Sequence, residues 1–372
     1  MKFPRPVKNK LLRAIAILVS VVVGAALVFS AYGGKMDPAT SSSGAIAAML
    51  FPIILMVSIL LLMVNLLWFR ISAVVTALSL IISWSAIITY CPIHLFRPSV
   101  ESIRQNHNPY IKVMTYNMLN LDDFSRDSCI VGEGNHTLEY VLEENPHLLV
   151  FQEGEQILTP DVKNISPDQH KRLLTQYPYR HVNNRGMGIL SHFPFTVVRV
   201  EHENRWLYDV DRYDVNIGSQ TLTVFNLHLQ SLGLTPTDKA IYHHLTNGET
   251  EDLNVIRSSL IHKLTSAFRE RAKQAMVVRD AVDSISGSLL VCGDFNDIPG
   301  CYAQRVIQGN DLSDAYRQAG LGPAITYHAD RFFFRIDHIL YRGNLKPLRV
   351  FNGTLRSSDH FPIIAYFEIT EN

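Results

Sequence analysis

Three long apolar stretches without a charged side chain occupy most of the first hundred residues, at about 14–32, 45–69 and 71–90. Each approaches or exceeds the roughly 20 residues that cross about 30 Å of hydrocarbon as a helix. Basic residues before the first stretch would also fit a cleaved signal peptide, but its apolar run is longer than the usual roughly 7–15 residues. We therefore predict that residues 1–98 form a membrane anchor with three transmembrane helices.

The basic residues of this region predict its orientation. Five of them precede the first apolar stretch: Lys2, Arg5, Lys8, Lys10 and Arg13. Positive charge is retained on the cytoplasmic side, so we expect an integral, multi-pass membrane protein with a cytoplasmic N-terminus. Residues 33–44 would then lie outside, and Arg70 would return to the cytoplasmic face. After three crossings the chain from Cys91 onward is expected to be extracytoplasmic, with Pro92 and Pro98 marking a break.

From Tyr110 onward the pattern changes to short β-rich runs separated by polar residues. Candidate strands span residues 111–116, 148–152, 188–191, 214–217, 221–227, 288–292, 336–341 and 363–369. Helical periodicity lies between some of them, most clearly over residues 137–144 and 258–284. Strands interspersed with helices favour the α/β class over a pure β-sandwich, so we predict an α/β domain over residues 99–372.

Charge divides the chain in the same way. Residues 1–100 contain eight Lys or Arg and one acidic residue, Asp37, which leaves 26 basic and 33 acidic residues in the remainder. Residues 101–372 therefore carry a formal net charge of −7. A domain of this sign does not attract nucleic acid over long range, which disfavours tight, nonspecific DNA binding.

The cysteines indicate neither a zinc site nor a cellular compartment. They are Cys91, Cys129, Cys292 and Cys301, with no CxxC pair among them. A zinc site is therefore not expected, and a domain of this size needs no disulfide scaffold. Cys292 lies within an apolar candidate strand, where we expect a buried free thiol.

Acidic, amide and imidazole side chains recur where six of the apolar strands begin or end. These positions are Asn117, Glu153, His228, Asp294, Asn296, Asp337, Asp359 and His360. A single Asp after a strand is usually a turn or cap residue, but turn chemistry does not explain six such ends. Loops at strand ends are where a rigid scaffold presents reactive groups. The pattern therefore predicts one site assembled from these residues.

Seven short motifs carry a resemblance to a known family. They are TYNML (115–119), FQE (151–153), GMGILSHFP (186–194), FNLHLQS (225–231), GDFND (293–297), RIDHI (335–339) and SSDHFP (357–362). In this order they resemble the endonuclease/exonuclease/phosphatase superfamily, which includes DNase I-like nucleases, sphingomyelinases and inositol-phosphate phosphatases. The resemblance covers residues 111–367, and GDFN with SDH is its most specific part. It implies a four-layer α/β/β/α sandwich (DNase I-like) with the active site at one rim.

The resemblance implies a metal site. Glu153 would be the main ligand and Asn117 would assist it, while Asp359 would be a ligand or lie just behind the ligands. Hard divalent ions prefer oxygen ligands, commonly one or two carboxylates with water. Mg²⁺ is the first choice of cofactor and Mn²⁺ the second, because no thiol or histidine cluster selects a softer metal.

The resemblance also implies catalytic roles. Asp294 would be the general base or orient the attacking water, and Asn296 would position the nucleophile and the phosphate. The two are two residues apart, so an extended backbone would point both side chains the same way. His360 would contact a phosphate oxygen, and Asp337 would orient its imidazole and favour the cationic form. His338 follows Asp337 and should face away, as a structural residue.

Three further residues are candidates for substrate contact. His228 would contact phosphate and could act as the general acid, and Asn226 on the same strand face would add a substrate contact. Arg185 could reach the substrate phosphate or be an ordinary surface arginine. Gly188 stands where the family more often has alanine, a change that does not affect the chemistry.

The predicted helix at 258–284 has basic residues beside an apolar face. They are Arg257, just before it, and Lys263, Arg269, Arg271 and Lys273. A solvated charged face is the simpler interpretation, and contact with lipid headgroups or nucleic acid is the alternative. The substrate class stays open between nucleic acid, a phospholipid headgroup and a sugar phosphate. The bilayer is the other expected partner, and no feature indicates an obligate protein partner.

Together these features predict a membrane-anchored, divalent-metal-dependent hydrolase of phosphate esters, either a phosphodiesterase or a phosphatase. The alternative is a catalytically inactive binding module of the same fold displayed on the membrane. Such a module should have lost at least one of Glu153, Asp294, Asp337 and His360, and all four are present. A transporter is disfavoured, because the three apolar stretches contain no charge that could form an ion pathway.

Overall fold

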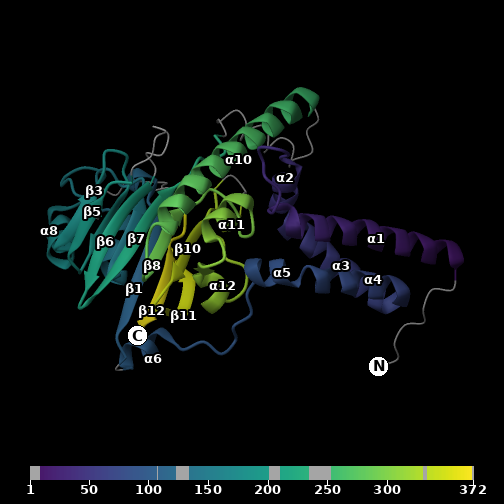
Figure 1. Cartoon of the computed structure of the whole chain (residues 1–372), viewed down its shortest axis with the longest axis horizontal. Helices are drawn as coiled ribbons and strands as arrows, with labels where there is room; N and C mark the ends of the chain where they lie inside the picture. Colours follow the sequence, from purple (N-terminus) through teal and green to yellow (C-terminus); the bar gives the residue numbers. More distant parts are fainter. Residues whose placement is uncertain are drawn as a thin grey trace.

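The computed structural model describes residues 9–106, 108–122, 134–200, 210–233, 253–329 and 333–370. Within them, a bundle of apolar helices extends to one side of a domain built on two β-sheets (Figure 1). Lys2, Arg5 and Lys8, which contribute to the predicted orientation, lie outside the described residues, as does Cys129.

The bundle contains five helices: α1 (Lys10–Gly33), α2 (Ser43–Met49), α3 (Phe51–Trp68), α4 (Arg70–Ile82) and α5 (Trp84–Tyr90). Two of them, α1 and α3, are long and apolar enough to cross a membrane. The first two predicted stretches therefore contain membrane-length helices. The third prediction needs correction, because α4 and α5 meet at 64° and form a third span only if the bent pair crosses as one.

A polar side chain joins three of these helices. Asn65 of α3 donates from Nδ2 to Ser20 Oγ of α1 at 2.9 Å and to Thr76 Oγ1 of α4 at 3.2 Å. Gly24 of α1 lies so close to α4 that an added Cβ would be 3.1 Å from the Cβ of Ser79. Small residues and buried amides are the usual means by which helices associate in lipid, where apolar surface gains nothing by pairing.

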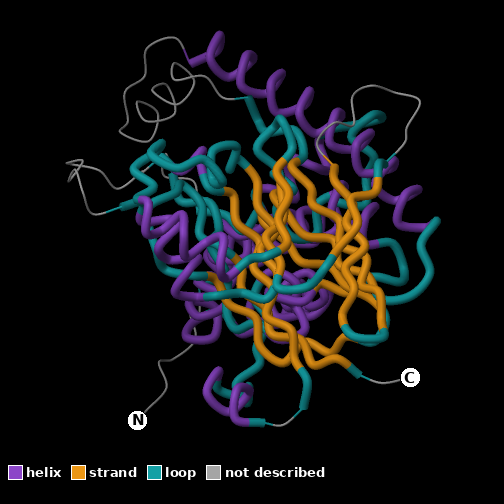
Figure 2. The backbone as a smooth tube through the Cα atoms, turned by 90° about the vertical axis from the view of Figure 1, so that its left-hand side faces the viewer, coloured by secondary structure: helices purple, strands orange, loops and turns teal. Residues whose placement is uncertain are grey.

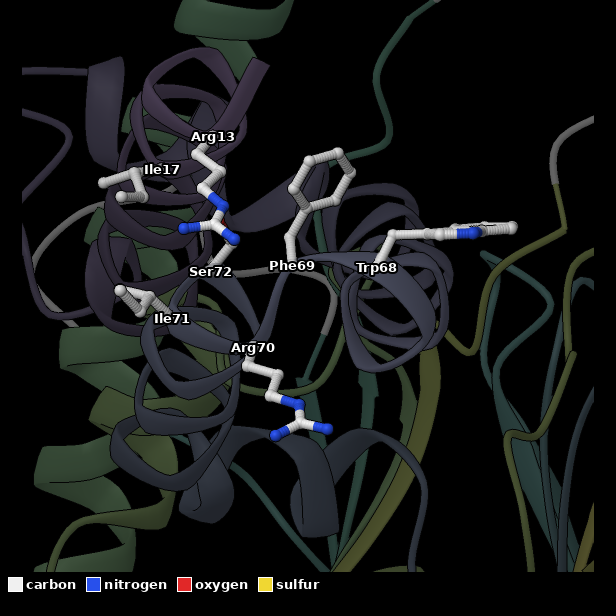
Figure 3. Close-up of a pocket in the computed structure, with 7 residues that line it drawn as sticks. All are labelled: Arg13, Ile17, Trp68, Phe69, Arg70, Ile71 and Ser72. Carbon is white, nitrogen blue, oxygen red and sulfur yellow. The ribbon is translucent and has the colours of Figure 1, made fainter. Parts of the chain in front are cut away.

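The end of the bundle farthest from the β-sheets carries two arginines. Arg13, near the start of α1, and Arg70, at the start of α4, line one hollow together with Trp68 and Phe69 (Figure 3). The opposite end of the bundle, where α2 and α5 lie, is next to the domain (Figure 1). Positive charge is thus gathered at the end that points away from the domain.

The domain contains two sheets, each with six strands in the described residues. Their strand orders are β11-β12-β1-β2-β4-β3 and β5-β6-β7-β8-β10-β9. The first sheet consists of β1 (Tyr110–Asn117), β2 (Leu148–Gln152), β3 (Tyr179–Val182), β4 (Gly188–Ser191), β11 (Leu345–Asn352) and β12 (Ile363–Ile369). The second consists of β5 (Phe195–Val198), β6 (Val210–Ile217), β7 (Gln220–His228), β8 (Leu289–Asp294), β9 (Ser313–Asp314) and β10 (Asp337–Arg342). All eight predicted strands coincide with one of these, and β3, β5, β9 and β11 are additional.

The two sheets face each other across a common core, and the helices lie around them (Figure 2), except that α12 (Ala315–Ala319) adds Ala315, Tyr316 and Ala319 to the core between the sheets. The helices are α6 (Val100–Gln105), α7 (His136–Glu144), α8 (Pro167–Gln176), α10 (Leu253–Asp283), α11 (Tyr302–Gln308) and α12, with a 3₁₀ turn, η1 (Leu119–Leu121). α7 and α8 bury apolar side chains against the first sheet, and α10 and α11 against the second. The predicted α/β class is confirmed, with two facing sheets and most helices on their outer faces.

The inter-sheet core reflects the sequence pattern directly. Central strands such as β2 and β8 are buried along their whole length and apolar except at their last residues, because their other face is covered by helices. Val113, Val150, Val224 and Leu290 meet between the sheets. Cys292 lies in the same core as a buried free thiol, as predicted.

Candidate active site

The order of the strands brings the predicted polar residues to one edge of the core. β1 and β2 run parallel, so Asn117 and Glu153 lie at the same ends of adjacent strands. β7 and β8 run parallel in the facing sheet, where His228 is opposite Asp294. β10 runs antiparallel to β8, and its first residue, Asp337, pairs with Asp294. Residues far apart in the chain therefore meet at one rim of the two sheets.

His360 is held between two carboxylates at this rim. Its Nδ1 lies 2.9 Å from Asp337 Oδ2, and its Nε2 lies 3.7 Å from Asp294 Oδ2. The Ser358 hydroxyl accepts from the His360 backbone N–H and donates to the carbonyl of Asn117. Burial alone would lower the pKa of His360, but the charges of Asp337 and Asp294 raise it to about 10. The imidazole is therefore cationic at neutral pH.

Asn117 and His228 each lie between Glu153 and Asp294. Asn117 Nδ2 donates to Glu153 Oε1 at 3.0 Å and to Asp294 Oδ2 at 3.2 Å. His228 Nε2 lies 3.6 Å from Glu153 Oε1 and 3.9 Å from Asp294 Oδ2. Glu153 adopts a left-handed backbone with φ of 51°, a conformation that turns the chain sharply after β2 and that non-glycine residues rarely adopt.

Negative charge is crowded at this rim. Burial raises the pKa of Asp294, and the neighbouring Asp337 raises it further. Burial also raises the pKa of Asp359, and Glu153 and Asp294 act in the same direction while His360 opposes them. When burial and neighbouring carboxylates raise the pKa of a carboxyl group in this way, a nearby cation stabilises its charged form.

The residues present fit a divalent cation. One possible ligand atom each from Asp294, Asp337 and His360 lies within 4.8 Å of the other two, but the cationic imidazole has no lone pair to offer, so the ligands available at this rim are oxygen atoms. Asp337 Oδ1 is buried without a hydrogen-bond partner. Glu153 and Asp359 line the same cavity as Asp294. Carboxylate oxygens are the donors that hard divalent ions prefer, so the chemistry of this group suits Mg²⁺ or Mn²⁺.

The rim opens into a cavity of about 350 Å³. Seven of the ten predicted site residues line it: Asn117, Glu153, His228, Asp294, Asn296, Asp359 and His360. Asp337 lies behind His360 and reaches the cavity through it. His338 is fully buried and faces the other way, with Nε2 2.9 Å from the carbonyl of Asp297. Burial and the charge of Arg335 lower the pKa of His338 to about 4, so it is a neutral structural residue.

The geometric reason given for Asn296 is wrong. Its backbone is left-handed, with φ of 50°, and not extended. Asp294 Oδ1 accepts the Asn296 backbone N–H at 2.8 Å, so the two residues form a tight turn closed by the side chain of Asp294. The Asn296 amide donates to the carbonyl of Leu229 at 2.9 Å and still lines the cavity. The turn, rather than strand periodicity, places both residues at the rim.

Asn226 and Arg185 do not contribute to the cavity wall. Asn226 is fully buried between the sheets, where Nδ2 donates to the carbonyls of Phe151 and Gly188 and Oδ1 accepts from Gln152. The predicted substrate contact of Asn226 is therefore wrong, because its donors and acceptor are used in joining the two sheets. Arg185 is exposed and does not line the cavity, which leaves its proposed phosphate contact without support.

Two charged residues of the cavity wall, Arg271 and Asp297, were not among the predicted site residues. Arg271 of α10 is only 1% exposed, and its Nε lies 3.7 Å from Asp297 Oδ2. Arg271 Nη1 donates to the carbonyl of Gln230 at 2.9 Å. The predicted solvated face of this helix is therefore wrong for Arg271, whereas the side chain of Arg257 lies outside the described ones. The sequence did contain an indication that Arg271 is buried, because it follows Leu264 and Phe268 at helical spacing on the apolar face of the helix.

Glycines are required at two positions of the recognised motifs. A Cβ on Gly293 of GDFND would lie 2.0 Å from the Leu227 carbonyl oxygen, and its φ of 139° disfavours other residues. A Cβ on Gly188 would lie 2.2 Å from the His181 carbonyl oxygen and 2.5 Å from the Phe151 ring. The departure from alanine at Gly188 is thus explained by the bulk of Phe151 beneath it.

Several solved structures are similar to this chain. Truncated TDP2 from Caenorhabditis elegans has 19% identity and a TM-score of 0.44 over 70% of this chain and 98% of its own. The endonuclease/exonuclease/phosphatase from Beutenbergia cavernae has 18% identity and a TM-score of 0.43 over 70% of this chain and 72% of its own. ANGEL2, a 2′,3′-cyclic phosphatase, has 16% identity and a TM-score of 0.41 over 71% of this chain and 97% of its own. No curated protein matches the chain.

A comparison of the sequence with models of protein families gives one match. The model of the Endonuclease/Exonuclease/phosphatase family matches residues 114–360, which extend from β1 to His360 and include every predicted site residue. This match supports a phosphoesterase-type hydrolase. The chain belongs to the Endonuclease/Exonuclease/phosphatase family.

Proposed function

We propose that the chain is a Mg²⁺-dependent phosphoesterase held on the membrane by residues 1–98, with residues 99–372 as its catalytic domain. The reaction is the in-line attack of an activated water on phosphorus. The observation that carries the proposal is the meeting of Asp294, Asp337 and His360 at the cavity rim, where the pKa of Asp294 and that of His360 are both raised. Groups perturbed in this way at a cavity are typical of catalytic sites.

Each residue has a distinct part in this proposal. Asp294 accepts the proton of the attacking water, and its raised pKa brings its basicity closer to neutral pH. Asn296 positions that water. His360 donates to a phosphate oxygen as a cation, and Asp337 is a positioning residue that holds its imidazole. His228, whose Nε2 lies 3.9 Å from Asp294 Oδ2, would protonate the leaving oxygen.

Glu153, Asp359 and Asn117 would hold the metal ion. When bound, Mg²⁺ neutralises charge on the phosphate and polarises its oxygens. Asn117 now directs its Nδ2 toward Glu153 and Asp294, and turning the amide over would offer Oδ1 as a ligand instead. The crowded carboxylates favour this assignment, because a cation between them removes their mutual repulsion.

The inactive-module alternative finds less support. In a protein that only binds, nothing would maintain a buried carboxylate with an unsatisfied oxygen, because such a group destabilises the fold. Asp337 Oδ1 is such an atom. Retention of this group together with Glu153, Asp294 and His360 favours turnover.

We further propose three membrane crossings with the catalytic domain outside. Arg13, near the start of α1, and Arg70, at the start of α4, lie at the end of the bundle away from the domain (Figure 1), as retention of positive charge in the cytoplasm requires. The α1–α3 connection and the end of α5 lie at the domain side (Figure 1). The bent α4–α5 pair then acts as the third crossing.

Substitution of a metal ligand tests the proposal. Glu153→Gln should raise the Mg²⁺ concentration for half-maximal hydrolysis of bis-p-nitrophenyl phosphate about 10-fold or more, because one charged ligand is lost. Glu155→Gln, at an exposed position two residues on, is the matched control and should leave the requirement unchanged. Activity that survives EDTA, or the same Mg²⁺ requirement in Glu153→Gln as in the parent, would contradict the metal assignment.

A further inference from the structure

The cavity has two chemically different halves. One half carries the carboxylates and imidazoles described above. The other is apolar and includes Met49, Leu264, Phe268, Ile298 and Phe334. A phosphate ester bound at Asp294 would therefore extend its remaining group over an apolar wall.

The membrane anchor itself contributes to this wall. Met49 is the last residue of α2, which lies between the two membrane-length helices α1 and α3. Ala45 of α2 packs on Leu264 and Phe268 of α10, and Ala48 packs on Ile298 and Cys301. The apolar half of the cavity is thus built jointly by the anchor and the catalytic domain.

The contact that holds α2 against the domain is close and specific. Gly34, directly after α1, lies against the Gly300 backbone so tightly that a Cβ would be 1.8 Å from the Gly300 carbonyl oxygen. Arg269 of α10 donates from Nε to the carbonyl of Pro38 at 3.2 Å. The segment between the first two apolar helices is therefore fixed on the domain, and Met49 is held at the cavity.

The charges of the cavity wall suit one phosphate rather than a chain of them. Among its described residues there is one arginine, Arg271, and no lysine. Arg271 faces Asp297, which offsets its charge. Proteins that follow a nucleic-acid backbone place rows of Lys and Arg along it, often with aromatic platforms. This cavity lacks such a row in the described part of its wall.

We propose that the substrate is a lipid phosphate ester taken from the membrane surface, with its phosphate at Asp294 and His360 and its hydrocarbon chain against the wall that begins at Met49. This proposal rests on the proposed function and names the substrate class of that site. Water adds to phosphorus, the ester P–O bond breaks, and the leaving oxygen takes up a proton. The bilayer in which α1 and α3 lie would supply the substrate next to Met49.

A series of p-nitrophenyl alkyl phosphates with methyl, butyl and octyl chains tests the inference. They undergo the same bond cleavage and differ only in apolar length. The full-length protein is assayed in a phosphate-free nonionic detergent with Mg²⁺, with each ester below its own micelle concentration. Each buried methylene is worth roughly fourfold, so kcat/KM should rise at least 100-fold from methyl to octyl.

A matched pair of substitutions locates the effect. Met49→Gln keeps the side-chain length and adds polarity at the wall, and should reduce the octyl preference, the ratio of kcat/KM for the octyl ester to that for the methyl ester, at least 10-fold. Met276→Gln makes the same change at an exposed position of α10 outside the cavity and should retain the full preference. A thermal midpoint of Met49→Gln equal to that of the parent shows that the variant is folded.

The opposing outcomes are distinct. Equal kcat/KM for methyl and octyl esters, or an octyl preference that Met49→Gln does not reduce, would overturn the lipid inference while the phosphoesterase function stands. Faster cleavage of a single-stranded oligonucleotide than of the octyl ester would overturn it in favour of nucleic acid. Hydrolysis of none of these substrates would instead contradict the proposed function itself.

Discussion

Two buried polar clusters contain residues that are close in the sequence, Asp337 in one and Arg335 in the other, but they differ in how their charges are arranged. Asp337 belongs to the rim, where it faces Asp294 and shares His360 with it. Two residues earlier, Arg335 pairs with Asp314, with Nη1 and Nη2 each 3.1 Å from Oδ2 and both side chains 1% exposed. The rim cluster brings two carboxylates together around one imidazole, whereas the second cluster pairs one carboxylate with one guanidinium.

The pKa values show what this difference means. Burial raises the pKa of Asp294, and its neighbour Asp337 adds to the rise. Burial alone would also raise the pKa of Asp314, but the charge of Arg335 outweighs it and leaves that pKa below its ordinary value. Desolvation acts on both carboxylates, and the neighbouring charges decide the outcome: the pKa of Asp294 stays raised because Asp337 adds to desolvation although His360 opposes it, and the pKa of Asp314 is lowered by Arg335.

The paired cluster also has a mechanical role. Arg335 donates from Nη2 to the carbonyl of Thr89 in α5 at 2.9 Å, so the same guanidinium that pairs with Asp314 joins the end of the helical bundle to the domain. Its ring contact with Tyr316 fixes the guanidinium further. The Asp294–Asp337–His360 cluster is thus suited to chemistry, and the Arg335–Asp314 pair, called the paired cluster below, is suited to holding the helical bundle against the domain.

The largest effect is expected at the rim. Asp294→Asn should lower kcat for bis-p-nitrophenyl phosphate by about 10²–10⁴, because general-base assistance is lost. Its thermal midpoint without Mg²⁺ should be no lower than that of the parent, since a repelled buried charge is removed. Asp280→Asn, at an exposed position of α10, is the control. A loss below roughly 10-fold would remove Asp294 from the chemistry.

The paired cluster should respond in the opposite manner. Arg335→Met leaves Asp314 buried without its partner, which costs about 3–5 kcal/mol in comparable cases. The thermal midpoint of the full chain in detergent should fall by roughly 10 °C. Replacing both partners, as Arg335→Met with Asp314→Asn, should recover part of that loss.

An exposed ion pair shows how small the loss of stability should be when a pair is not buried. Lys273 lies 2.8 Å from Glu270 on α10, with 67% of its side chain exposed. Lys273→Met should change the free energy of unfolding by less than about 1 kcal/mol. If Arg335→Met were equally mild, the paired cluster would not hold the anchor, and the contrast between the two clusters would fail.

Much of the fold follows from local pattern. The eight predicted strands are long or apolar enough to be recognised, and most of them are central in their sheets. β3 and β5, by contrast, are only four residues long and largely exposed, so they show no clear apolar alternation. β11 contains Pro347 beside a register shift, and proline normally argues against a strand.

The site was predictable where it depends on strand ends and not where it depends on depth or distant contacts. Asn226 and His228 lie on the same face of β7, but only His228 is at the rim. Asn226 is two residues farther from the strand end and is therefore buried between the sheets. Met49 enters the cavity because α2 docks on α10, a contact between segments more than 200 residues apart. Spacing along the chain does not record such a contact.

The smallest expected effect is the pH dependence of the paired cluster. The lowered pKa of Asp314 means that its pairing stabilises the fold fully above the unfolded pKa of about 4, and that this contribution is lost as pH falls through the folded pKa. The thermal midpoint of the parent should exceed that of Asp314→Asn by a constant amount from pH 7 to about pH 4. The difference should shrink only below that range, where Asp314 takes up a proton.

Thermal midpoints of the two proteins in the same detergent, measured from pH 7 to pH 3, check this expectation. Other carboxylates titrate equally in both, so their contributions cancel in the difference. Convergence already above pH 5 would mean that the pKa of Asp314 is raised rather than lowered, as for Asp294 at the rim. The two buried carboxylates would then differ in position but not in electrostatics, and the assignment of one cluster to chemistry and the other to anchoring would lose its physical basis.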